Sequence, residues 1–119
     1  MAYIDGFLLP LPTGNIDEYR RQAQAAGQIW IEHGALAFQE CIADDVTSQG
    51  TLTFPELIKT QESETVVFSY IVFESREHRD QVNAKVMADP RLKNLCDPDN
   101  LPFDCKRMAY GGFNSLVSL

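Results

Sequence analysis

The sequence has few of the features that mark nucleic-acid-binding or membrane proteins. Only 10 Lys and Arg stand against 17 Asp and Glu in 119 residues, which gives a net charge of −7. Binding to a phosphate backbone requires clustered basic side chains, so we predict that the chain does not bind nucleic acid. No apolar run approaches the roughly 20 residues of a membrane-spanning helix, so we also predict no membrane association.

Cysteine and histidine are scarce as well. Cys41, Cys96 and Cys105 are an odd number without C-x-x-C spacing, which is unlike a disulfide framework. His33 and His78 are far apart and belong to no metal-binding motif, so we predict neither a metal nor another cofactor. Reduced thiols, and an N-terminus without a basic stretch ahead of an apolar core, predict a cytoplasmic protein.

What the sequence does contain is a series of predicted strands and helices that form one domain, residues 1–119. Apolar segments predict strands over residues 2–12, 35–45, 64–74 and 106–113, and apolar residues three to four apart predict helices over 16–33 and 76–88. Asn15 and Ser75 are the expected N-caps. The long connection 46–63 includes a predicted short strand at 51–54, and residues 97–102 are expected to form a polar loop.

This order, β-α-β-β-α-β, predicts an α+β fold of the ferredoxin-like type. Right-handed crossovers then give a four-stranded antiparallel sheet with two helices on one face. The opposite face is left open, and strand 64–74 is apolar on both of its sides. A second copy packed sheet to sheet would cover the open face, so we predict a homodimer, arranged as a dimeric α+β barrel.

Polar residues inside predicted strands are the candidates for a site. Alternation places Tyr3, Asp5 and Phe7 on one face of the first strand and Gly6 on the other. Because glycine suits the close approach of a helix, we expect Gly6 to face the helices and Asp5 to face the barrel interior. The small residues at the odd positions of strand 35–45 are likewise assigned to the helical face, which leaves Glu40 on the open side.

A carboxylate in a central strand requires a partner, and the last strand offers two. Lys106 and Arg107 are adjacent, so they point to opposite faces, and one of them is expected to reach Asp5. The predicted pocket therefore comprises Asp5, Glu40, Tyr70 and Arg107. Two interpretations stay open: an acid/base group of raised pKa in a pocket, or an ion pair that only fixes packing and dimer register.

Several segments together resemble a known family. They are Tyr3–Phe7, Gly34–Leu36, Glu40–Cys41 with Ala43–Val46, Glu64–Ser69, Asn83–Met87 with Asp89–Arg91, and Pro102–Phe113. With these segments the chain resembles the YbaA-like family, a bacterial family of unknown function numbered 1428. The resemblance implies a dimeric α+β barrel, in agreement with the predicted plait. It implies no established activity and no catalytic residues.

Three functional hypotheses follow. The first is a small homodimeric protein that binds a small molecule in the barrel between its subunits. The second, by analogy of fold alone, is a cofactor-independent monooxygenase- or isomerase-like enzyme for a small aromatic or polyketide-like substrate. The third is a stress-related or regulatory interaction module without chemistry.

Overall fold

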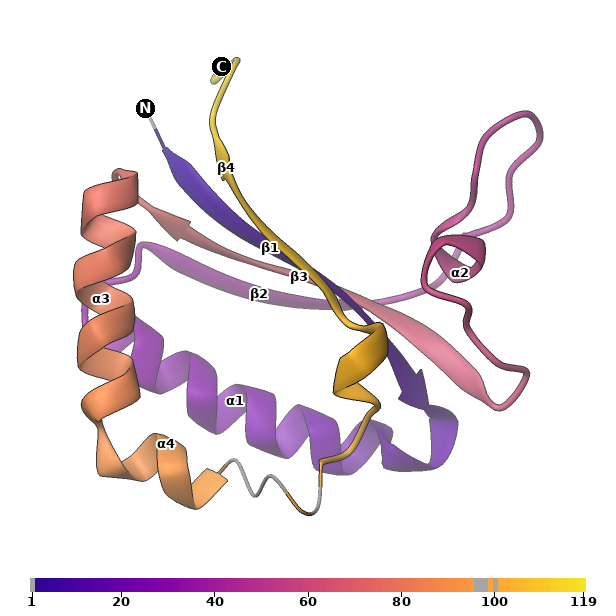
Figure 1. Cartoon of the computed structure of the whole chain (residues 1–119), viewed down its shortest axis with the longest axis horizontal. Coiled ribbons are helices and arrows are strands. Elements are labelled where there is room, and N and C mark those ends of the chain that lie inside the picture. Colours follow the sequence, from indigo (N-terminus) through magenta and orange to yellow (C-terminus); the bar gives the residue numbers. More distant parts are fainter. Residues whose placement is uncertain (1, 96–98, 100) are drawn as a thin grey trace.

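The computed structural model describes residues 2–95, 99 and 101–119, and it contains one four-stranded antiparallel sheet. The strands are β1 (Tyr3–Pro12), β2 (Ala37–Ile42), β3 (Glu64–Phe73) and β4 (Ala109–Asn114), in the spatial order β2-β3-β1-β4. The main helices, α1 (Ile16–Glu32), α3 (Arg76–Ala88) and α4 (Pro90–Leu95), lie on one side of this sheet (Figure 1). The predicted ferredoxin-like plait is confirmed.

The two long helices form where the sequence pattern predicts them. Ser75 caps α3 by accepting a hydrogen bond from the His78 amide, 3.0 Å away. Val82 and Val86 lie on the inner face of this helix, and their side chains are buried. Helix α1 approaches β2 closely at Gly27, where an added Cβ would come within 2.7 Å of the Phe38 ring. A larger residue at position 27 would therefore push the helix away from the sheet.

Two predictions of secondary structure are wrong, one of an element type and one of a strand boundary. Residues 51–54 do not form a strand; instead Thr53 caps the short helix α2 (Phe54–Leu57). The last strand begins at Ala109, because the residues before it, Cys105–Arg107, form a 3-10 helix capped by the Asp104 side chain. Half of the predicted loop at 97–102, namely residues 97, 98 and 100, lies outside the described residues.

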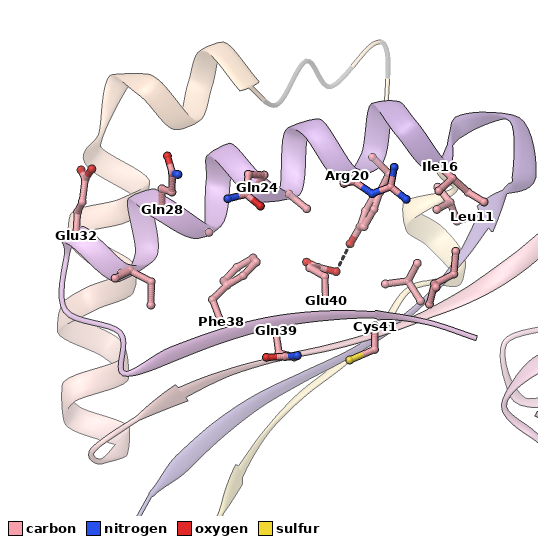
Figure 2. A pocket seen from close by; sticks show the side chains of 16 residues that line it. Leu11, Ile16, Arg20, Gln24, Gln28, Glu32, Phe38, Gln39, Glu40 and Cys41 are labelled. Carbon is pink, nitrogen blue, oxygen red and sulfur yellow. Dashed lines mark hydrogen bonds between the residues drawn. The ribbon is translucent and has the colours of Figure 1, made fainter. Parts of the chain in front are cut away.

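The assignment of the sheet faces from small residues is also wrong. Tyr3, Asp5 and Leu9 are buried among residues that pack beneath the helices, whereas Gly6 lies on the open face, where the Phe113 ring is its neighbour. On β2 the larger residues Phe38 and Glu40 point toward α1 (Figure 2). Bulky side chains are required to fill the space under the helices, and this requirement outweighs the fit of small residues to a close helix.

The register aligns helix-facing residues in rows across the sheet. Glu40 pairs with Ser69, Ser69 with Phe7, and Phe7 with Tyr110, and we call these four residues the central row. Phe38, Ile71, Asp5 and Gly112 form the next row. Asp5 and Glu40 therefore lie on the same, helix-covered face of the sheet, in neighbouring rows.

The open face of the sheet has a different composition. Strand alternation places one charged residue of the described strands on this side, Glu64 at the start of β3, and it pairs with Arg107. The other side chains of this face are uncharged and mostly apolar; they are Ile4, Leu8, Pro10, Pro12, Ala37, Gln39, Cys41, Val66, Phe68, Tyr70, Val72, Ala109 and Phe113. Phe68 and Phe113 remain 45% and 62% exposed in the single chain.

Candidate functional site

A chamber of about 580 Å³ lies between the sheet and the helical layer. Its floor is the central row with Phe38, Ile71 and Asp5, and its roof comes from α1, α3, α4 and residues 101–108. Most of the lining is apolar, and aromatic rings are prominent: Phe7, Tyr19, Trp30, Phe38, Phe103 and Tyr110. A concave, mostly apolar cavity with a few polar groups is the usual form of a small-molecule site.

Glu40 is the polar group at the β2 side of the chamber. Its carboxylate accepts a hydrogen bond of 2.7 Å from the Tyr19 hydroxyl on α1. Burial raises the pKa of Glu40, while the hydroxyl groups of Tyr19 and Ser69 act in the opposite direction by hydrogen bonding to the carboxylate. The same burial, together with the charge of Glu40, raises the pKa of the Tyr19 phenol.

A second cavity, which we call the groove, lies on the other side of this hydrogen bond. It has a volume of about 600 Å³ and runs between α1 and β2 at the edge of the sheet (Figure 2). Tyr19, Ala23, Phe38 and Glu40 line both cavities, so the Tyr19–Glu40 pair forms part of the wall between them. Arg20, Gln24, Gln28 and Glu32 of α1 also line the groove.

Asp5 lines the chamber too, but its partner is not the predicted one. Arg79 of α3 donates a hydrogen bond of 2.9 Å to Asp5 Oδ1 and another of 2.8 Å to the Tyr110 hydroxyl. The guanidinium also lies 5.0 Å from the centre of the Tyr3 ring. Asp5 is only 1% exposed, so this buried ion pair joins the central strand to α3.

The other two predicted residues do not join Asp5 and Glu40 beneath the helices. Arg107 forms two hydrogen bonds of 2.7 Å to Glu64, which tie the 3-10 helix to the start of β3. Tyr70 borders the chamber, but strand alternation places its ring on the open face, 6.2 Å from the Phe68 ring. Lys106 and Arg107 could not alternate between sheet faces because they lie outside β4.

The predicted pocket set missed Arg79 and Tyr19, although helical spacing carried the signal for both. Arg79 precedes Val82 and Val86 by three and seven residues, which places it on the inner face of α3. Tyr19 belongs to the apolar stripe of α1 that faces the sheet. An arginine on the inner face of a helix is an obvious partner for a carboxylate on the strand below it.

Two further features, a membrane-spanning helix and a metal site, are not found among the described residues. No helix among them combines the length and apolar character needed to cross a membrane. Within residues 2–95, 99 and 101–119, no group of three or more His, Cys, Asp and Glu side chains is placed to hold a metal ion.

Comparisons with known proteins agree with this architecture. The crystal structure of a NIPSNAP family protein of unknown function from Agrobacterium tumefaciens matches 94% of this chain and 86% of its own, with a TM-score of 0.59 and 16% identity. A NIPSNAP domain protein from Burkholderia xenovorans matches with a TM-score of 0.55 at 12% identity, covering 95% and 93% of the two chains. At these identities the likeness supports the fold alone.

Sequence relatives are much closer. The uncharacterized protein YbaA of Escherichia coli K12 is 44% identical over 117 residues, which is 98% of each chain, and YbaA of Shigella flexneri matches equally well. The names of these relatives state no activity. The family model described as a protein of unknown function, DUF1428, matches residues 2–105. The chain therefore belongs to the DUF1428 family.

Proposed function

We propose that the protein binds a small molecule in the chamber of each subunit. The observation that carries this proposal is a cavity of about 580 Å³ that has a mostly apolar lining and the half-buried carboxylate of Glu40 within it. The site lies beneath the helices, not between subunits, because Asp5 and Glu40 both face the helical layer. A solidly packed interior would have favoured an interaction module instead.

The test uses the single tryptophan as a reporter. Trp30 lines the chamber, and its indole N–H donates to Asn83 Oδ1 at 3.0 Å. An uncharged hydrophobic fluorophore that enters the chamber should quench Trp30 emission in a saturable way. Native mass spectrometry of freshly purified protein should detect any ligand that is retained from the cell.

A pair of variants controls for nonspecific binding. Ala23→Phe on α1 should fill part of the chamber and weaken binding, whereas Ala84→Phe on the exposed side of α3 should leave it unchanged. Circular dichroism checks that both variants are folded. Equal binding by both folded variants would show that the fluorophore binds elsewhere and would contradict the proposal.

Dimerisation through the open face is the second part of the proposal. Support comes from the mostly apolar strand residues of that face, where Phe68 is 45% exposed. Light scattering should give the mass of a dimer for the natural chain, and Phe68→Asp should shift it to the monomer. Ile31→Asp, at a 46% exposed position on α1, is the matched control and should remain dimeric. A natural chain that is monomeric at micromolar concentration would contradict this part.

The proposed setting is the bacterial cytoplasm. The relatives described above are bacterial proteins, and Cys41 is a free thiol, which suits a reducing compartment.

A further inference from the structure

Resting on the proposed function, we infer that the ligand of the chamber is an organic cation, a small amine with an aromatic or apolar body whose ammonium group contacts Glu40. Three features of the chamber support this class of ligand: its charge, the hydrogen bonds already made by Glu40, and the rings that surround it.

The charges that line the chamber are all negative. Among its described lining residues there is no Lys, Arg or His, and the acidic residues are Asp5 and Glu40. Arg79 neutralises Asp5 through the 2.9 Å ion pair. Glu40 takes part in none of the ion pairs found between described residues. Arg20 lines the groove and not the chamber, and it pairs with Asp17 at 2.8 Å. An anionic ligand would thus meet no neutralising charge, while a cation would supply the one that Glu40 lacks.

The hydrogen bonds of Glu40 indicate that it acts as an acceptor. Tyr19 donates to Oε2, and the Ser69 hydroxyl also stabilises the ionised form. A carboxylate has about four acceptor positions, so it can receive further N–H donors from a ligand. An ammonium group offers only donors, which matches the remaining capacity.

Aromatic rings lie close to this carboxylate. Phe38 is two residues before Glu40 on the same strand face, and its ring centre is 6.1 Å from that of Trp30. Tyr19 contacts Glu40 directly, and Phe103 packs edge-on against Tyr19 at 5.9 Å. Rings around a desolvated cation attract it through their quadrupoles, and such cages are used to recognise ammonium ligands. The net charge of −7 also favours the approach of cations.

The experiment compares three probes that share one body and differ in charge: 2-naphthylmethylamine, 2-naphthalenemethanol and 2-naphthoate. Binding is followed by Trp30 fluorescence and by calorimetry at about pH 7.5, where the amine is protonated. We expect the amine to bind at least about tenfold tighter than the alcohol, and the carboxylate to bind weakest. Glu40→Gln should remove the preference for the amine while the alcohol still binds. Glu62→Gln, which makes the same charge change at an exposed position, should keep the preference.

The outcomes separate this inference from the proposed function. Equal affinity for amine and alcohol in the natural chain would overturn the cation class while leaving the chamber as a ligand site. A preference that survives Glu40→Gln would overturn the role of Glu40 in selecting the cation. If neither the probes nor the uncharged fluorophore bind, the proposed function and this inference are both wrong.

Discussion

The carboxylates at the two ends of the chamber, Asp5 and Glu40, have opposite electrostatic environments. Asp5 is buried with a full cationic partner, Arg79, whose guanidinium also bonds to Tyr110. Glu40, in the neighbouring row of the same face, is half-buried, and its hydrogen-bond donors among the described residues are the hydroxyl groups of Tyr19 and Ser69. The first arrangement stabilises the fold by joining β1 to α3. The second costs folding free energy because burial disfavours the ionised carboxylate, and it lies beside a cavity, which is typical of a functional group.

The largest expected effect concerns the Asp5 end. Asp5→Ala leaves Arg79 without its buried counter-charge, and the loss should be about 3–5 kcal/mol in free energy of unfolding. Adding Arg79→Met should recover part of that loss because it removes the unpaired charge. Urea unfolding of the two single variants and the double variant measures the coupling.

Lys106→Met provides the control for this cycle. Lys106 is exposed on the 3-10 helix, so its removal from the Asp5→Ala variant should recover nothing. If Lys106→Met rescues stability and Arg79→Met does not, the partner of Asp5 has been assigned wrongly.

A smaller effect is expected at the Glu40 end. Tyr19→Phe removes the hydroxyl that donates to Glu40 and should destabilise the fold by about 1.5–3 kcal/mol, the range of a hydrogen bond to a charged group. In a Glu40→Gln background the same change should cost less because the acceptor is neutral. An equal cost in both backgrounds would mean that Glu40 is uncharged at the pH of the measurement.

The smallest expected effect is a gain in stability when Glu40 is replaced by Gln. Burial raises the pKa of Glu40, so the folded state holds this proton more tightly than the unfolded chain does. Ionisation of Glu40 therefore lowers stability at pH values above its folded pKa, and that loss disappears as the pH falls through this value toward the ordinary value of 4.5.

Glu40→Gln should consequently stabilise the protein by about 1 kcal/mol or less near pH 8, and the gain should vanish near pH 4. The groups that face this carboxylate are Tyr19 and Ser69, with Asp5 in the next row and Arg20 on the groove side. Thermal unfolding across this pH range measures the difference. A loss of stability that is the same at every pH would indicate that Glu40 is a purely structural residue.

Particular residues show how far sequence reasoning reached at the site. Alternation correctly grouped Tyr3, Asp5 and Phe7 on one face, but Gly6 was given too much weight in deciding which face this was. The need of Asp5 for a basic partner was predicted correctly. The prediction places this partner on the neighbouring strand, whereas α3 supplies Arg79 from 74 residues away.

The sequence by itself determined the element order, and with it the ferredoxin-like plait, because hydrophobic periodicity and chain handedness are local or general properties. It also determined that strand β1 carries a carboxylate that needs compensation. Only the tertiary structure decided which face the helices cover, which cation compensates Asp5, and that Glu40 has no cationic partner within the part of the chain that the structure describes. These outcomes depend on how bulky side chains from distant segments fill the space between helix and sheet, and no single segment contains that information.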